Sequence, residues 1–230
     1  MKSAILAATI ASTFAFAPSP TGRASTSVSE SKADLQNLAA KLNPAVKYFD
    51  PLNLAEAEFW GESNEATIGF LRESEVKHGR VAMFAFVGYI VHANGITWPW
   101  AMTLAGDPFP KVSNAPEAWD AIPEAAKWQI FAFVGFLEFW RESQCDKHYM
   151  SGGKVGYFPP FDAKYIPGGA LNLYRPFGAE EMTAEKKENR LRAEINNGRL
   201  AMLGIFGFIS EGATEGSVPA LTGVIPHYDG

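Results

Sequence analysis

The sequence has almost no cysteine and no excess of basic residues. Cys145 is the single cysteine among 230 residues, which excludes an intrachain disulfide and a cysteine-rich metal site. The 20 Lys and Arg residues are outnumbered by 25 Asp and Glu, and the net charge is −5. Nucleic-acid-binding domains carry a basic patch, so we expect no nucleic acid among the partners.

Histidine pairs are missing too. None of the four histidines has another at i, i+3 or i, i+4, whereas metal-dependent membrane enzymes usually need convergent histidine clusters. The mean hydropathy of −0.07 resembles that of a soluble protein. This average misleads, because the apolar residues gather in three blocks that are separated by long polar loops rich in proline and glycine.

The first 30 residues are expected to form a targeting presequence outside the fold. "MKSAILAATIASTFAFAPSP" has an early lysine, an apolar run too short to span a bilayer, and small residues before Pro18, as signal peptides do. "TGRASTSVSESK" follows, rich in Ser and Thr, as plastid transit segments are. Together they resemble the bipartite presequences of algae with complex, red-lineage plastids, where a junction like "AFAP" (15–18) is common. A plain secretory signal is the alternative. Residues 31–230 are expected to form one domain.

The chain contains an internal repeat with an offset of 119 residues. "ESEVKHGRVAMFAFVGYIVH", which ends at His92, aligns with "RAEINNGRLAMLGIFGFISE", which ends at Glu211. At the same offset, "LNL" at 52–54 aligns with "LNL" at 171–173. Two motifs that share one offset without a gap indicate two related halves, each a loop followed by a helix.

Both repeat units have the pattern of a helix with a charged first half and an apolar second half. We expect helices at about 65–93 and 183–212, the first about 42 Å long at about 1.5 Å per residue. That length is enough to cross a bilayer of about 30 Å. A third helix is expected at 121–143, with Pro123 in its first turn. The sequence thus predicts an all-α membrane protein with three transmembrane helices, of which the first and third are pseudo-two-fold related and cross.

Each repeat carries a glutamate and an arginine that cannot pair with each other. Glu75 and Arg80 are about 140° apart around a helix axis and are neither i, i+3 nor i, i+4 neighbours. Ionised residues at membrane depth are costly and normally find a partner inside the bundle. If the repeat helices cross about a two-fold axis, Glu75 meets Arg199 and Glu194 meets Arg80.

Small residues accompany these charges. Gly79, Ala82 and Gly88, with their repeat positions, are expected to let the two helices approach closely. Lys77 has no partner in this scheme, and we expect it at the surface, reaching for lipid headgroups.

The remaining polar residues of the expected helices each offer a lone pair. They lie three and seventeen positions after the two repeat glutamates, and on the middle helix: His78, Asn197, His92, Glu211, Gln129 and Glu138. Positions three and seventeen are about 20 Å apart along a helix, so they do not converge on one metal ion. Magnesium porphyrins need such single ligands, because Mg²⁺ accepts oxygen and imidazole and a flat tetrapyrrole leaves only axial positions. A glutamate could give one oxygen to magnesium and the other to an arginine fork.

The signature E-x-x-[HN]-G-R-x-A-M occurs twice, at 75–83 and 194–202. With the helix between them, these motifs cover most of residues 48–211, and on them the sequence resembles the chlorophyll a/b- and a/c-binding light-harvesting family. The resemblance implies that chlorophyll magnesium is ligated by Glu75, His78, Glu194 and Asn197, and that Arg80 and Arg199 form the crossed ion pairs. It further implies pigment contacts for Glu138, Gln129, His92 and Glu211.

Two loops resemble segments that hold carotenoid end groups in this family, "FDPLNLA" (49–55) and "PGGALNLYRPFG" (167–178). The ending "EGSVPALTGVIPHYDG" looks like the fucoxanthin and peridinin chlorophyll a/c antenna branch. The resemblance therefore implies chlorophyll a, chlorophyll c rather than b, and fucoxanthin- or peridinin-type xanthophylls as cofactors. It implies a multi-pass protein of the plastid thylakoid membrane, in contact with lipid and neighbouring antenna proteins. The function implied is an antenna, not an enzyme, that serves photosystem I rather than II. A photoprotective quencher of the same family and an unrelated membrane transporter are the alternatives.

Overall fold

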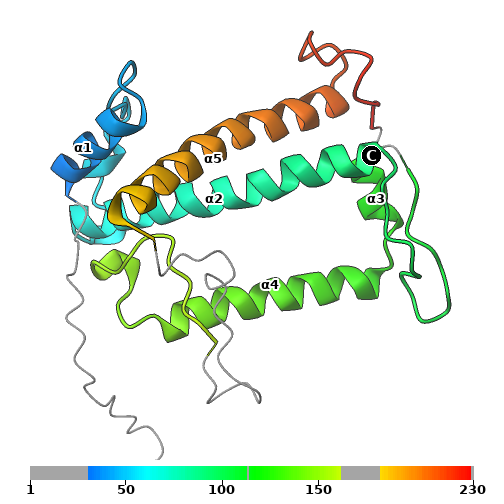
Figure 1. The fold of residues 1–230 in the computed structure, drawn as a ribbon, viewed down its shortest axis with the longest axis horizontal. Helices are drawn as coiled ribbons and strands as arrows, with labels where there is room; N and C mark the ends of the chain where they lie inside the picture. Colours follow the sequence, from blue (N-terminus) through cyan, green and yellow to red (C-terminus); the bar gives the residue numbers. More distant parts are fainter. Residues whose placement is uncertain (1–30, 113, 162–181, 229–230) are drawn as a thin grey trace, which may run out of the picture.

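The fold is built from three long helices and several short ones (Figure 1). The computed structural model describes residues 31–112, 114–161 and 182–228. The helices are α1 (Lys32–Leu42), α2 (Asn64–Ala93), α3 (Ala115–Ala121), α4 (Glu124–Gln144) and α5 (Ala184–Ala213), with the short 3₁₀ helices η1 (Leu54–Glu56), η2 (Phe59–Gly61) and η3 (Tyr149–Ser151). The expected all-α class is confirmed. The predicted presequence and the second loop (167–178) lie outside the described residues.

Local sequence explains where the long helices begin. Ser63 precedes α2 and its side chain accepts a hydrogen bond from the Ala66 amide, while Thr183 caps α5 through the Lys186 amide. Such caps satisfy amides that lack a partner within the helix. Pro123, expected in the first turn of the middle helix, is instead the N-cap of α4, with an extended ψ of 141°; Ala121, expected to begin that helix, ends α3.

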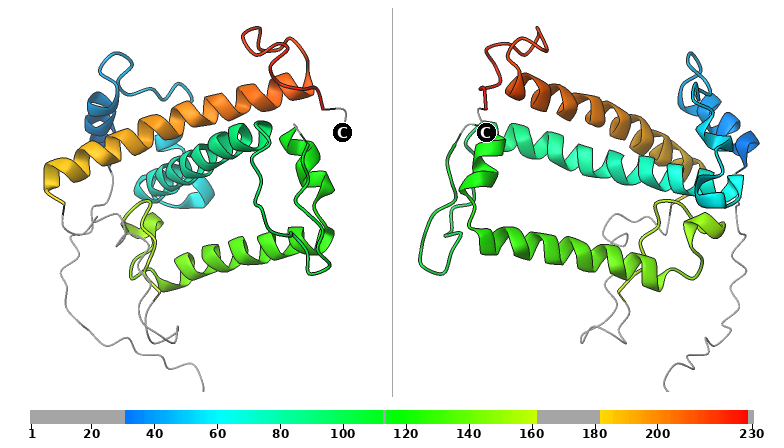
Figure 2. Two further views of the ribbon diagram at one scale, coloured as in Figure 1. Left: turned by 45° about the vertical axis from the view of Figure 1, so that its right-hand side comes forward. Right: turned by 180° about the vertical axis from the view of Figure 1, so that it is seen from behind.

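The helices α2 and α5 run side by side in the same chain direction and cross (Figures 1 and 2). A Cβ atom added to Gly79 would lie 3.1 Å from the Cα of Gly198, and one added to Gly198 would lie 2.9 Å from the Cα of Gly79. Each glycine thus faces the other, as a two-fold axis through the crossing requires. Ala82 and Ala201, also related by the repeat, are 6% and 8% exposed beside them. The predicted crossing is confirmed.

The prediction that Gly88 lies at the close approach is wrong. No atom lies within 4 Å of a Cβ added there. Helices that cross at an angle separate with distance from the crossing, and Gly88 lies about 13 Å beyond Gly79 along α2. The widening space is filled by Phe86, which stacks on Phe208 at 5.0 Å between ring centroids and lies against Gly204.

The helix α4 lies apart from the crossed pair (Figure 2). The segment with α3 joins it to α2 at one end, and residues 145–161, including η3, lead back under α2 at the other (Figure 1). Only Trp140 and Arg141, near its C-terminal end, are buried. Most of the remaining α4 side chains are exposed, including a set of large apolar ones: Trp128, Ile130, Phe131, Phe133, Val134, Phe136 and Phe139.

Within the described residues, no helix has a segment that combines the length and the apolar character needed to cross a membrane.

Candidate functional site

Two ion pairs hold α2 against α5 near the crossing. Arg199 donates to Glu75 Oε1 from Nε at 2.7 Å and from Nη2 at 2.6 Å. Arg80 donates from Nε to Glu194 Oε1 at 2.6 Å. Both partnerships connect the helices in the crossed manner that the repeat predicts, and both are confirmed.

Sequence reasoning missed additional partners of these charges. Arg72, one turn before Glu75 on the same helix, also pairs with Glu75. Arg80 donates a second hydrogen bond, from Nη1 to the Gly156 carbonyl at 2.8 Å. The i, i+3 spacing of Arg72 and Glu75 was a visible signal, whereas nothing local in the sequence points to Gly156.

His78 is exposed and its ring is held in one orientation. Nδ1 lies 2.8 Å from the carbonyl oxygen of Ser74. A carbonyl can only accept, so Nδ1 is the donor in this contact, and in the neutral ring the lone pair then lies on Nε2. A hydrogen bond from one ring nitrogen that leaves the other available is the usual arrangement of a metal-ligating histidine.

Asn197, at the repeat position of His78, is exposed as well. In the described part of the chain its side chain has no hydrogen-bond partner. Its neighbour Asn196 differs, because the Asn196 amide donates to the Leu42 carbonyl of α1 at 3.2 Å. The two adjacent asparagines thus have separate roles, one in holding α1 and one directed outward.

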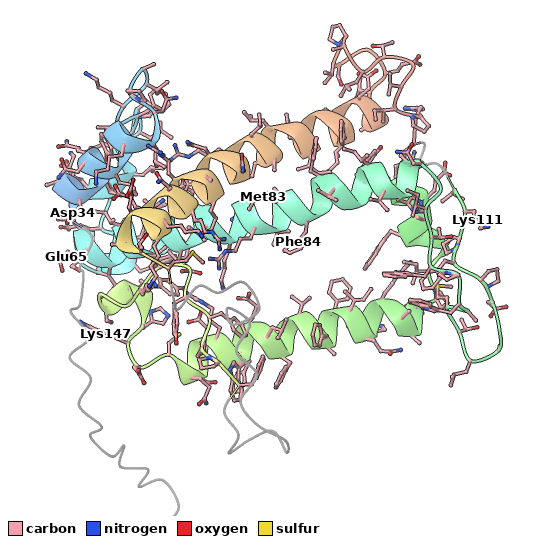
Figure 3. The ribbon with its side chains drawn as sticks, viewed as in Figure 1. Asp34, Glu65, Met83, Phe84, Lys111 and Lys147 are labelled. Atoms are coloured by element: carbon pink, nitrogen blue, oxygen red, sulfur yellow. The ribbon has the colours of Figure 1, made fainter. Side chains whose placement is uncertain are left out.

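An apolar face continues from each of these outward ligands. His78 is followed by Val81 and Phe84, which are 68% and 82% exposed, and Phe84 projects on the side of α2 that faces α4 (Figure 3). The equivalent residues after Asn197 on α5 are Leu200 and Leu203, 69% and 71% exposed. Residues three apart are neighbours on a helix surface, so each series forms a continuous strip that winds around its helix. Both halves therefore present a lone-pair donor at the head of an uncovered apolar strip.

On α4, Gln129 and Glu138 are exposed. The Gln129 amide nitrogen donates to the Ala125 carbonyl at 3.2 Å, which turns its oxygen outward as an available ligand. Glu138 forms an ion pair with Lys77 of α2, so Lys77 is not the unpartnered surface residue that the sequence suggested. The structure gives it a partner on another helix.

His92 and Glu211, predicted as equivalent ligands, lie in different surroundings. The His92 Nε2 atom is buried and has no hydrogen-bond partner among the described residues. Glu211 is 1% exposed and accepts hydrogen bonds from the amides of Gly216 at 3.0 Å and Val218 at 2.7 Å. Its carboxylate therefore closes the turn after α5, a role the sequence did not reveal, and pigment binding by either residue stays a prediction.

The loop 49–55 is organised around Asp50. Its carboxylate accepts hydrogen bonds from the amides of Leu54 at 2.9 Å and Ala55 at 3.1 Å, and from the Tyr48 hydroxyl at 3.0 Å. The bond from the Ala55 amide, with that from Leu54, lowers the pKa of Asp50 below its ordinary value. Phe49 and Leu52 are left 75% and 76% exposed, so this loop also offers an apolar surface.

The donors that the structure turns outward suit magnesium. They are an imidazole nitrogen, two side-chain amides and carboxylates, and none is a thiolate. Mg²⁺ prefers oxygen ligands and takes few of them from protein, while softer metals select sulfur. His78 and Asn197 are each followed along their helix by exposed apolar residues. The set therefore fits separate planar magnesium pigments, each held by one axial ligand.

Most of the chain is similar to proteins that have been characterised. Residues 33–213 match the family described as chlorophyll A-B binding protein. A fucoxanthin-chlorophyll a-c binding protein of Trieres chinensis is 36% identical over 225 residues, 95% of this chain and 98% of that protein. The fucoxanthin-chlorophyll a-c binding protein F of Phaeodactylum tricornutum is 34% identical over 210 residues, 91% of this chain and 94% of that one. The chain belongs to the chlorophyll A-B binding protein family.

Proposed function

We propose that this chain is a light-harvesting antenna protein that binds chlorophylls and carotenoids and passes excitation energy to a photosystem. It is a scaffold for pigments and not an enzyme. The observation that carries the proposal is the twofold arrangement of an outward ligand, His78 or Asn197, at the head of an exposed apolar strip. A flat magnesium tetrapyrrole needs one lone-pair donor for the metal and an apolar protein surface for its ring and tail.

The cofactors proposed are chlorophyll a, chlorophyll c and a fucoxanthin-type xanthophyll. The names of the similar Trieres and Phaeodactylum proteins support this choice. The residues proposed as ligands of chlorophyll magnesium are Glu75, His78, Glu194, Asn197, Glu138 and Gln129. Loop 49–55, ordered by Asp50, is assigned to a carotenoid end group.

We place α2, α4 and α5 across the thylakoid membrane, with the chain in the plastid. Large apolar side chains are exposed on all three helices, and on α2 and α5 they recur at the repeat offset: Val81, Phe84, Val87 and Ile90, then Leu200, Leu203, Phe206 and Ile209. At the end where α2 leads into α3, Trp98 and Trp100 stack at 4.6 Å and are 63% and 58% exposed. Tryptophan is enriched at membrane–water interfaces, which supports this orientation.

The protein acts by fixing distances and orientations. Bound chlorophyll supplies light absorption and the transferable excited state. The chain supplies rigidity: Arg199 and Arg80 neutralise Glu75 and Glu194 and lock the crossing of α2 and α5. The Ser74 carbonyl sets the tautomer and ring plane of His78. Each ligand is thus held on a helix whose position is set by another helix.

The partners proposed are a photosystem core, neighbouring antenna proteins and membrane lipid. Among cores we favour photosystem I over photosystem II, following the overall resemblance of the sequence.

Replacing Asn197 tests the site that carries the proposal. Asn197→Leu should lose about one chlorophyll per protein when the full chain is reconstituted with chlorophyll a, chlorophyll c and fucoxanthin, because each axial ligand serves one magnesium. Pigments are counted after extraction and chromatography. Asn196→Leu is the matched control: it removes the bond to Leu42 and should leave the chlorophyll count unchanged. An unchanged count in Asn197→Leu would remove Asn197 from the ligands.

A further inference from the structure

The ion pair between Lys77 of α2 and Glu138 of α4 is one of the contacts that join these two helices near the C-terminal end of α4. We propose that Lys77 is a positioning residue for a chlorophyll site at Glu138: it neutralises this carboxylate and directs one of its oxygens toward the pigment magnesium. The inference deepens the proposed function and rests on it.

A cation from another helix also pairs with each carboxylate of the crossing, although Glu75 has a second partner, Arg72, on its other oxygen. Arg199 reaches Glu75 from the opposite helix, and Arg80 reaches Glu194 in the same way. Lys77 supplies the cation at Glu138, with its ammonium on Oε2, and lies farther from Glu142, at 3.9 Å from Oε1. Within the described residues, Oε1 of Glu138 accepts no hydrogen bond. At Glu138, Oε2 is therefore neutralised by the Lys77 ammonium, while Oε1 stays open to bind a metal ion.

The nearest cation on α4 itself is not available to Glu138. Arg141 lies one turn further along α4, but it is 5% exposed and its Nη2 pairs with the buried Glu73 of α2 at 2.7 Å. Its Nε donates to the Tyr157 carbonyl at 3.2 Å. Glu73 in turn accepts from the Gly156 amide at 2.7 Å. Arg141 is thus committed to a buried network, and the charge for Glu138 comes from another helix.

Glu138 needs a counter-charge because of what surrounds it. Val134 and Phe131, one and two turns earlier on the same face of α4, are 50% and 59% exposed. A pigment over this strip would exclude water, and an isolated carboxylate in an apolar environment is very costly. An ammonium is a compact point charge, so it can bind one oxygen and leave the second accessible.

The internal repeat shows that this cation is specific to the contact with α4. The repeat position of Lys77 is Asn196, which holds the Leu42 carbonyl instead. The repeat position of Glu73 is Arg192. The repeat is therefore broken at the two α2 residues that reach α4, whereas Gly79 and Ala82 at the crossing recur in α5 as Gly198 and Ala201.

Substitutions at Lys77 and Glu138 test the proposal on the full chain, reconstituted with chlorophyll a, chlorophyll c and fucoxanthin. Lys77→Met keeps most of the side-chain stem and removes the charge, Lys77→Arg keeps the charge, and Glu138→Leu removes the ligand. Lys127→Met is the matched control, because Lys127 lies on α4 over the Trp119 ring and away from Glu138. The readouts are chlorophylls per protein and the absorption difference spectrum against wild type.

Lys77→Met and Glu138→Leu should each lose about one chlorophyll and give the same difference spectrum, and the double variant should lose no more than Glu138→Leu alone. Lys77→Arg and Lys127→Met should keep the full count. A full count in Lys77→Met, or a loss that adds to that of Glu138→Leu, would overturn the role of Lys77 while leaving the antenna function intact. A full count in Glu138→Leu would overturn the site itself, and failure of the wild-type chain to bind any chlorophyll would refute the proposed function.

Discussion

At the scale of single residues, charged and neutral candidate ligands follow different rules. His78 and Asn197 are exposed and form no ion pair among the described residues. The carboxylates of Glu75, Glu194 and Glu138 each pair with a cation from another helix. A carboxylate near apolar surface carries a desolvation cost that an imidazole or an amide does not. A carboxylate ligand therefore requires a cation on the neighbouring helix, whereas an imidazole or amide ligand does not.

The carboxylate of Asp50 gives a pH prediction. Its pKa is lowered in the folded chain, first by the bond from the Ala55 amide and then by that from Leu54, so the ionised form stabilises loop 49–55. This stabilisation is fully present above the unfolded value of about 3.9 and is lost as the pH falls through the folded pKa. We expect the hydrogen-exchange protection of the Leu54 and Ala55 amides to fall over that acid range.

In an Asp50→Asn variant the same protection should no longer depend on this titration. Protection of Leu54 and Ala55 that stays constant through the acid range in the wild-type chain would show that Asp50 does not organise the loop.

At the scale of elements, the crossing of α2 and α5 depends on two glycines. Gly198→Ala places a Cβ 2.9 Å from the Cα of Gly79, which only a shift of the helix backbones can relieve. Overpacking of this kind costs about 1–3 kcal/mol. We therefore expect a lower thermal unfolding midpoint for the reconstituted protein.

Gly88→Ala is the control for that substitution, because its Cβ meets no atom within 4 Å. Alanine is favoured over glycine inside a helix by about 0.5–1 kcal/mol, so its midpoint should stay the same or rise. Equal midpoints for Gly198→Ala and Gly88→Ala would mean that the close approach at the crossing does not limit stability.

The repeat predicted the elements it contains and little beyond them. The repeat relates Glu75 to Glu194 and Arg80 to Arg199. A two-fold crossing therefore gives each of these residues a partner from sequence alone. The buried pair of Glu73 and Arg141 could not be found this way, because α4 has no repeat mate and Glu73 corresponds to Arg192. Whether Gly88 lies close to α5 depends on the angle between the two helices, which a sequence pattern does not give.

At the scale of the whole molecule, the protein leaves much of its apolar surface uncovered by the described part of its own chain. The helix α4 is secured near one end through Arg141 and Lys77, while side chains such as Phe133 and Phe139 along it are 63% and 72% exposed. Contiguous exposed apolar surface marks a binding site or a membrane contact. The pigments and the lipid contacts proposed above would together cover this surface.

Pigment content of the native protein tests the central claim most directly. The full chain, purified from thylakoid membranes in mild detergent, is extracted and its pigments are separated and quantified against protein. We predict several chlorophylls per chain, of types a and c, together with fucoxanthin-type carotenoid, and chlorophyll fluorescence when the carotenoid is excited. A purified, folded protein that yields no chlorophyll would contradict the account.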